Sequence, residues 1–436
     1  MFSSPKSSGP LSPDTANQDA YSVSPAVATV YAKLAACQEV QAGLAFLAAD
    51  EKAAIRDQIA IAEIPAPPFQ EHARAEYYRQ RLQELGLENV TTDSEGNVFG
   101  VYRGSSASGS GPRLFISAHL DTVFPAGTDT SVKEKDGRLY APGIADDARG
   151  LAAILSVIRA LKAAKIKTAG DIIFGGSVGE EGLGDLRGVK AFFRDNKDID
   201  GFITVDGTGI NLITYLATGS LRYKITYKGP GGHSFNAFGL PSAIHALGRA
   251  IAKIADIKPP SQPKTTFTVG TASGGTSVNS IAAQASMLID MRSNCNAELR
   301  KLEKTVLALV DAAAAEENAR WGSQAITAEI KLVGDRPAGQ QAPDAPIVQA
   351  AWASTLAVGA KPELSPASST DANLPISLGI PALRLGGGGA EGNNHSLDEW
   401  YDPAGSYLGP QKIFLTALGL AGIDGLTSPL LPVLAK

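Results

Sequence analysis

The chain has 436 residues, of which 44% are hydrophobic, and its 39 basic and 44 acidic side chains give a formal charge of −5. This length exceeds one ordinary hydrophobic core and predicts more than one domain. The acidic balance, without a Lys/Arg cluster, argues against a nucleic acid partner. No apolar run is long enough for a membrane span, so we expect no membrane partner. Cys37 and Cys295 do not indicate a disulfide framework.

The N-terminal half begins with a Ser/Pro-rich segment, residues 1–24, that predicts a disordered tail. It lacks an apolar signal core, so we expect a cytoplasmic protein, with export after removal of a signal as the alternative. Helical spacing is expected at residues 25–50, 51–64, 70–85, 150–162 and 186–194. Strand patterns occur at residues 89–92, 98–102, 113–118, 171–178 and 202–205. This alternation predicts a three-layer α/β domain with a mostly parallel sheet.

Residues 216–332 have a different order of expected elements, β-α-β-β-α-β, which predicts an inserted α+β ferredoxin-like domain. Its strands are expected at 221–227, 265–271, 284–292 and 325–332, and its helices at 241–254 and 298–318. After this insertion, helices and strands alternate again, with a helix at 346–358, a strand at 381–385 and a helix at 410–420. The first domain therefore comprises residues 25–215 and 333–436.

Metal-competent side chains follow the strand-like and glycine-rich segments of the first domain. Binding sites in open α/β sheets form at the carboxyl ends of strands, so we expect these side chains to meet. The set consists of His119, Asp146, Glu180, Glu181, Asp206 and His395. A two-metal hydrolytic site needs such ligands, one bridging carboxylate and one free carboxylate as base. We expect Asp146 to bridge, Glu180 to be the base and the other four to be ligands.

The expected ligands suggest which metal the site would hold and how the metal would activate water. Imidazole and carboxylate ligands suit Zn²⁺, with Mn²⁺ or Co²⁺ as possible substitutes. Two cations about 3.5–4 Å apart would share a water and lower its pKa towards about 7. Glu180 would take the proton of that water and pass it to the leaving nitrogen. Asp121, two residues past His119, would accept the other ring N–H of that histidine.

Two other patterns give competing hypotheses. Residues 175–179 fit the G-x-S-x-G nucleophile elbow, with Ser177 as nucleophile, but the residues that follow are a poor helix start. Residues 387–392 fit the dinucleotide fingerprint, but an apolar helix does not follow them. His72 and His245 lie in expected helices and are interpreted as structural.

Five motifs resemble, in sequence order, a family of dinuclear-zinc exopeptidases and deacylases. They are residues 117–123 (SAHLDTV), 143–150 (GIADDARG), 179–182 (GEEG), 205–207 (VDG) and 231–234 (GGHS). The family includes peptidase T, glutamate carboxypeptidase, acetylornithine deacetylase and succinyl-diaminopimelate desuccinylase, and the resemblance covers about residues 50–436. It implies that His119 and Asp206 complete one metal position around Asp146, and that Glu181 and His395 complete the other. An Asp at position 206 resembles the peptidase T side of the family.

The resemblance also implies roles for residues outside the metal cluster. His233 would reach the neighbouring active site of a homodimer and stabilise the oxyanion there. Arg292 and Asn279 resemble a pair that grips a substrate carboxylate, a task that suits a bidentate guanidinium. Gly387 and Gly388 would let the backbone approach the substrate closely.

The expected function is metal-dependent hydrolysis of an amide bond in di- or tripeptides. The alternative is deacylation of N-acyl amino acids by the same mechanism. A non-catalytic binding protein is a third class, and the presence of Glu180 beside a full ligand set argues against it.

Overall fold

The computed structural model describes residues 21–106 and 110–435 of the chain. Most of the predicted tail lies outside the described residues, but Tyr21, Val23 and Ser24 contact the folded domain. The ring of Tyr21 lies against Trp352 with the ring centroids 4.1 Å apart, and its hydroxyl donates to the carbonyl of Pro343 at 2.7 Å. The prediction of disorder up to residue 24 is therefore wrong for residues 21–24.

Four helices open the described chain: α1 (Pro25–Ala36), α2 (Gln38–Ala49), α3 (Glu51–Ala62) and α4 (His72–Glu84). The single helix expected at 25–50 is two helices, because Cys37 has an extended backbone between them. Ser24 caps α1 with its hydroxyl, and Pro25 occupies the first turn, where its missing N–H costs nothing.

The central sheet has eight strands in the order β1-β2-β6-β3-β7-β16-β8-β15. Their bounds are β1 (Glu88–Thr92), β2 (Val98–Tyr102), β3 (Arg113–His119), β6 (Asp171–Ser177), β7 (Gly201–Val205), β8 (Leu212–Thr214), β15 (Glu363–Leu364) and β16 (Ala382–Leu385). The four central strands, β6, β3, β7 and β16, run parallel to one another. All seven residues of β3 except the first are buried, as expected for a parallel strand covered on both faces.

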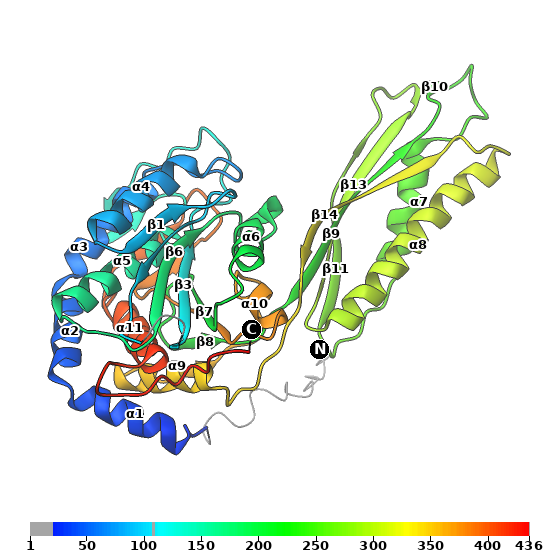
Figure 1. The fold of residues 1–436 in the computed structure, drawn as a ribbon. Coiled ribbons are helices and arrows are strands. Elements are labelled where there is room, and N and C mark those ends of the chain that lie inside the picture. The colour runs from blue at the N-terminus through cyan, green and yellow to red at the C-terminus, as the bar shows by residue number, and fades with distance from the viewer. Residues whose placement is uncertain (1–20, 107–109, 436) are drawn as a thin grey trace, which may run out of the picture.

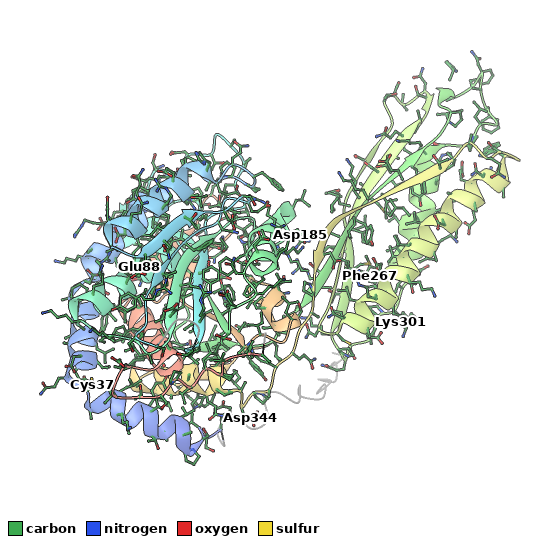
Figure 2. All side chains as sticks on the ribbon, in the orientation of Figure 1. Cys37, Glu88, Asp185, Phe267, Lys301 and Asp344 are labelled. Atoms are coloured by element: carbon green, nitrogen blue, oxygen red, sulfur yellow. The ribbon has the colours of Figure 1, made fainter. Side chains whose placement is uncertain are left out.

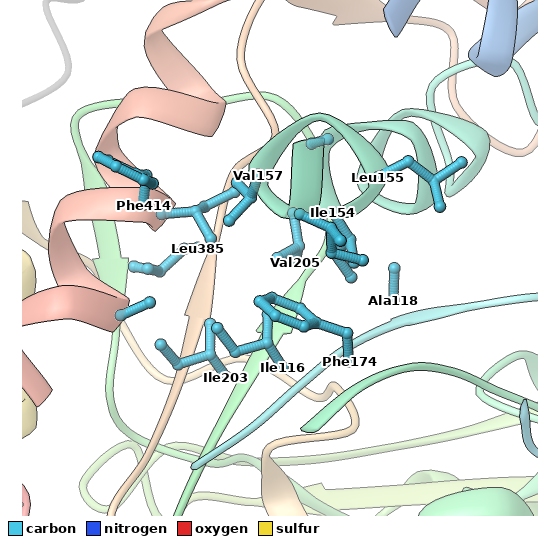
Figure 3. Packing of buried hydrophobic residues seen from close by; sticks show 14 of the residues in the cluster. Ile116, Ala118, Ile154, Leu155, Val157, Phe174, Ile203, Val205, Leu385 and Phe414 are labelled. Carbon is cyan, nitrogen blue, oxygen red and sulfur yellow. The ribbon is translucent and has the colours of Figure 1, made fainter. Parts of the chain in front are cut away.

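Helices cover both faces of this sheet, which makes three layers (Figure 1). One face packs against α5 (Ala148–Ala163), α9 (Pro346–Ala357) and α11 (Leu408–Ala421) through the main core, where Ile116, Phe174 and Val205 meet Ile154 and Phe414 (Figure 3). The other face packs against α6 (Arg187–Asp195) and α10 (Asn373–Ser377) in a second core rich in phenylalanine. The alternation of side chains along each strand separates the two cores.

The inserted domain runs from β9 to β14 and projects away from the first domain (Figure 1). It contains β9 (Gly219–Lys228), α7 (Ala243–Ala255), β11 (Thr265–Gly274), β13 (Gln284–Ser293), α8 (Asn296–Arg320) and β14 (Thr327–Arg336). The antiparallel order β11-β13-β9-β14 and a core shared with both helices confirm the predicted ferredoxin-like layer. Two short strands, β10 (Gly232–His233) and β12 (Ser280–Ile281), lie at its far end.

The two domains meet where β14 passes the start of α6. Asp185 lies on the side of the first domain that faces the inserted domain (Figure 2). Its carboxylate accepts the backbone N–H of Asp335 at 2.8 Å. Strand β14 continues to Arg336, beyond the predicted end at residue 332. The inserted sheet therefore reaches the first domain with its last residue.

A second, four-stranded sheet in the first domain was not predicted. It has the order β17-β18-β5-β4, with β4 (Lys133–Lys135), β5 (Arg138–Tyr140), β17 (Ala390–Gly392) and β18 (Trp400–Asp402). Strands of three residues are too short to give a readable alternation. In the part of the chain that the structure describes, no helix combines the length and apolar character needed to cross a membrane.

Candidate metal centre

The strand order explains why the predicted ligands come together. Strand β3 lies between β6 and β7, and its register pairs His119 with Ser177 on one side and Ser117 with Thr204 on the other. The carboxyl ends of the three strands are therefore neighbours. His119 ends β3, Glu181 follows β6 and Asp206 directly follows β7.

His119, Asp146 and Glu181 form the centre of the site, because their ligand atoms all lie within 4.8 Å of one another. Nε2 of His119 is 2.8 Å from Oδ1 of Asp146. Nε2 of His395 is 3.0 Å from Oδ2 of Asp146 and 2.9 Å from Oε1 of Glu181. Each oxygen of Asp146 thus faces a different histidine, which is the placement that a bridging carboxylate requires.

Asp206 lines the same cavity, where its hydrogen-bond partner is an arginine. Its Oδ1 is 3.3 Å from Nη2 of Arg384, a residue of β16 that the sequence did not single out. The structure therefore brings four of the five predicted ligands into direct contact and pairs the fifth with an arginine.

The carboxylates beside the two histidines favour positive charge in this cluster. Burial alone would lower the pKa of His119, but the hydrogen bond to Asp146 raises that pKa well above its ordinary value. Hydrogen bonds to Asp146 and Glu181 raise the pKa of His395 to about 10. Two imidazoles among three carboxylates form a donor set that fits borderline divalent cations such as Zn²⁺.

Asp121 supports the cluster in a way that differs from the prediction. Its backbone carbonyl, and not its carboxylate, lies 2.9 Å from Nδ1 of His119. The buried carboxylate instead accepts the backbone N–H groups of Glu180 at 3.0 Å and Glu181 at 2.8 Å. One residue therefore orients the histidine and holds the turn that carries both glutamates.

Glu399 is a supporting residue that the sequence reasoning missed. Its buried carboxylate accepts the backbone N–H groups of Gly143 at 3.1 Å, Ala145 at 2.9 Å and Asp146 at 3.0 Å. Burial raises the pKa of Glu399 to about 7. No spacing rule pointed to it, although it lies four residues after His395 in the same loop.

Glu180, the predicted base, lies in the same cavity of about 420 Å³ as the metal cluster. Burial raises the pKa of its carboxyl well above the ordinary value, and Arg336 opposes this rise. Nη1 of Arg336 is 3.1 Å from Oε1 of Glu180. Arg336 was missed because the expected strand stopped four residues early; continuing its alternation would have placed Arg336 on the sheet.

Arg292 also lines the metal cavity, but Asn279 does not. Asn279 and His233 instead line a separate cavity at the far end of the inserted domain. The predicted Arg292–Asn279 pair is therefore not formed within one chain. The two residues lie at opposite ends of β13, because Asn279 precedes that strand and Arg292 nearly ends it.

Gly387 and Gly388 do not line the metal cavity. Gly387 accepts a hydrogen bond from Nε of Arg149 at 2.8 Å. At Gly388, which has a φ of +87°, a Cβ atom would lie 2.2 Å from the carbonyl oxygen of Ser406. In this structure the glycines permit close packing against the start of α11.

The nucleophile-elbow hypothesis is not supported. Ser177 is the last residue of a buried strand, and its hydroxyl donates to the carboxylate of Asp371 at 2.5 Å. A nucleophilic serine needs an exposed hydroxyl at a strand-to-helix turn that is hydrogen bonded to a histidine. The hydroxyl of Ser177 is buried, and the hydrogen bonds it makes are to Asp371, Ser117 and the carbonyl of Ala118, although His119 is its neighbour on β3.

Comparisons with known proteins agree with the fold. The family model of Peptidase family M20/M25/M40 matches residues 115–416. Succinyl-diaminopimelate desuccinylase of Nitrosospira multiformis is 26% identical over 285 residues, which cover 61% of this chain and 74% of the relative. The uncharacterised protein YqjE of Bacillus subtilis is 24% identical over 354 residues, covering 77% and 90% of the two chains.

Solved structures show the same architecture. The tripeptidase of Staphylococcus aureus superposes with a TM-score of 0.69 at 21% identity, covering 84% of this chain and 97% of that one. Aminopeptidase PepT of Bacillus cereus gives a TM-score of 0.67 at 22% identity with the same coverage. A dinuclear metal-binding peptidase of Bacillus subtilis gives 0.62 at 18% identity, covering 86% and 99%.

Fold, ligand cluster and relatives together define a metal-dependent hydrolase of the peptidase and amidohydrolase class. The chain belongs to Peptidase family M20/M25/M40. The expected fold class and the expected family are both confirmed.

Proposed function

We propose that the protein is a zinc-dependent exopeptidase that hydrolyses an amide bond in di- or tripeptides. The observation that carries this proposal is the single cavity in which the ligand cluster, Glu180 and Arg292 face one another. Such a cavity has room for a small peptide, and it combines cation ligands, a buried carboxylate and a carboxylate-binding guanidinium.

Divalent cations held by His119, Asp146, Glu181, Asp206 and His395 would supply an activated water and polarise the carbonyl. Glu180 takes a proton from the attacking water as the new C–O bond forms. It delivers that proton to the nitrogen as the C–N bond breaks, so one water yields one carboxylic acid and one amine. Arg336 orients Glu180 through the 3.1 Å hydrogen bond, and Asp121 fixes the backbone on which Glu180 stands.

A homodimer is the second part of the proposal. His233 lies at the far end of the inserted domain, where Phe235 and Val278 are 84% and 103% exposed. Nδ1 of His233 accepts the backbone N–H groups of Phe235 at 3.2 Å and Asn236 at 3.3 Å. Nε2 then carries the proton and is free to donate to an oxyanion. In the homodimer that we propose, a second copy packs against this end of the inserted domain and places its cavity beside this histidine.

The test combines metal dependence with substrate choice. The protein is treated with a chelator, reloaded with Zn²⁺ or Mn²⁺, and assayed with dipeptides, tripeptides and N-acyl amino acids. We expect activity on peptides that chelation abolishes and metal restores, with no effect of a fluorophosphonate. Hydrolysis of N-acyl amino acids alone would replace the peptidase assignment with the deacylase one, and fluorophosphonate inhibition without metal dependence would contradict both.

A further inference from the structure

Three arginines lie on one face of the inserted sheet, on the side away from its helices. The register places Ser220 of β9 between Arg292 of β13 and Arg336 of β14, and places Asp290 opposite Arg222. Residues two apart on a strand share a face, so all of these side chains point the same way. The residues between them on β9 pack against α7 and α8. This face forms one wall of the metal cavity.

Arg222 is fixed in place by two groups. Its Nε is 2.9 Å from Oδ1 of Asp290, whose other oxygen is 2.7 Å from Nε of Arg292. Its Nη1 donates to the carbonyl of Gly182, the residue after Glu181. Gly334 lies opposite Arg222 on β14, and a Cβ there would come within 3.1 Å of the Arg222 stem. The missing side chain leaves space for the guanidinium to reach the first domain.

Arg222 and Arg292 both have N–H groups left over that could bind an anion. Among the described residues, none accepts a hydrogen bond from Nη2 of Arg222 or from the terminal nitrogens of Arg292. Asp290 is one carboxylate shared by two guanidinium groups, so one positive charge is left over. Arg336 and Arg384 have their own carboxylate partners, Glu180 and Asp206, and are less available.

The rest of the cavity wall is formed almost entirely by polar and charged residues. Of the described residues that line it, Val123 alone is aliphatic. The wall beside Arg336 is formed by the hydroxyl side chains of Ser368, Ser369 and Thr370. Four arginines and four carboxylates line the cavity, so two divalent cations would leave it strongly positive. A large apolar substrate side chain would meet charged groups here, whereas a second carboxylate would be neutralised.

We propose that Arg222 binds the side-chain carboxylate of an Asp or Glu residue next to the hydrolysed amide bond. Arg222 is then the residue that selects acidic substrates. Arg292 remains available for the terminal carboxylate of the substrate. This proposal rests on the proposed function and names its substrate class: small peptides that carry an acidic residue.

The first experiment compares substrates that differ only in this charge. Metal-loaded protein is assayed with Gly-Glu against Gly-Gln and with Glu-Gly against Gln-Gly. We expect the wild type to prefer the acidic member of at least one pair. The variants are Arg222→Met and Arg222→Gln, and the second keeps a hydrogen-bond donor for Gly182. In both, we expect the kcat/KM for the acidic substrate divided by that for its amide to fall about 10- to 100-fold, because a charged hydrogen bond is lost.

The matched control is Lys224→Met, because Lys224 is an exposed cation on the same strand and the same face, farther from the cavity. We expect it to keep the wild-type ratio. Metal content and thermal unfolding of each variant show whether the site remains folded. An unchanged ratio in both Arg222 variants, with metal bound, would mean that Arg222 only ties the two domains together and would overturn the proposal.

A binding experiment separates this proposal from the proposed function. Calorimetry of the metal-loaded wild type and both Arg222 variants compares glutarate with its monoamide, and neither ligand requires turnover. We expect glutarate to bind about 10-fold or more tightly than the monoamide in the wild type only. Equal binding in the wild type would refute the role of Arg222, whereas failure to hydrolyse any peptide would refute the peptidase function alone.

Discussion

Nη1 of Arg336 lies 3.1 Å from Oε1 of Glu180, so the last residue of an inserted-domain strand is hydrogen bonded to the proposed general base. Arg336 also donates to the backbone carbonyl of Glu180 and lies 3.2 Å from the hydroxyl of Ser369. Both members of this ion pair are buried. A residue of the inserted domain is therefore part of the proposed reaction centre.

Replacing Arg336 by Met is expected to lower kcat/KM at least about 10²-fold, because the base loses the group that orients it. Removing one partner of a buried ion pair is also costly to stability, by about 3–5 kcal/mol. Arg336→Lys should recover part of the rate. Lys331→Met, on the exposed part of the same strand, is the control, and equal rates in it and Arg336→Met would contradict the orienting role.

We expect Glu180→Gln to lose activity but keep its metal, and Asp146→Ala to lose its metal. The amide of Gln cannot accept a proton from water, so the rate should fall about 10²–10⁴-fold while metal remains bound. Asp146→Ala removes the carboxylate that faces both His119 and His395, so bound metal should be lost. Elemental analysis beside kcat separates the two outcomes. Full metal content and near-normal rates in both variants would remove the site assignment.

Three of the expected ligands were predictable because they lie at strand ends. His119, Glu181 and Asp206 each follow an apolar run of the β-type, and neighbouring parallel strands end at the same edge of a sheet. The inserted fold was predictable from its pattern along the chain, since β13 alternates between buried and less buried residues over its whole length.

The partners of these residues were not predictable from local patterns. Glu399 and Arg336 reach the site through tertiary packing across 253 and 156 residues of sequence. Asp206 was predicted only as a ligand, because no rule links it to Arg384 on a strand formed much later in the chain. Local spacing identifies the groups that do chemistry, whereas the contacts that orient them depend on the whole fold.

Lys412 provides a prediction about stability and pH. It is buried in α11, and its Nζ donates to the carbonyls of Ile210 and Leu212, each at 2.8 Å. Burial, aided by Arg384, lowers the pKa of Lys412 to about 7. Between about pH 7 and the ordinary pKa of 10.5, the unfolded chain holds this proton and the folded chain does not. The contribution of Lys412 to folding should therefore become more favourable as the pH rises.

Urea unfolding of the wild type and Lys412→Met at pH 6, 7, 8 and 9, without added metal, measures this contribution. The wild-type free energy of unfolding minus that of the variant should rise above pH 7, by at most about 1.4 kcal/mol per pH unit. The neutral amine still has two N–H groups for the two carbonyls. A difference that stays constant from pH 6 to 9 would show that Lys412 keeps its proton in the folded protein.

His233→Ala tests the proposed homodimer. His233 lies outside the metal cavity of its own chain, so a catalytic effect requires a second copy. Removing one oxyanion donor costs about 10²–10³-fold in rate, and we expect a loss of this size with metal content unchanged. Sedimentation should show a dimer for the wild type and for the variant, since the imidazole is not what joins the copies.

Subunit exchange then decides whether the histidine acts across the dimer. His233→Ala and Glu180→Gln are each expected to lose most of the activity, but a mixed dimer would contain one site with an intact Glu180 and an intact histidine from the other subunit. Mixing the two variants and allowing exchange should therefore restore part of the activity, up to one working site in each mixed dimer. Exchange is followed independently with differently tagged subunits. If mixed dimers form and remain inactive, His233 does not serve the neighbouring site, and the rate loss of the single variant has a structural origin.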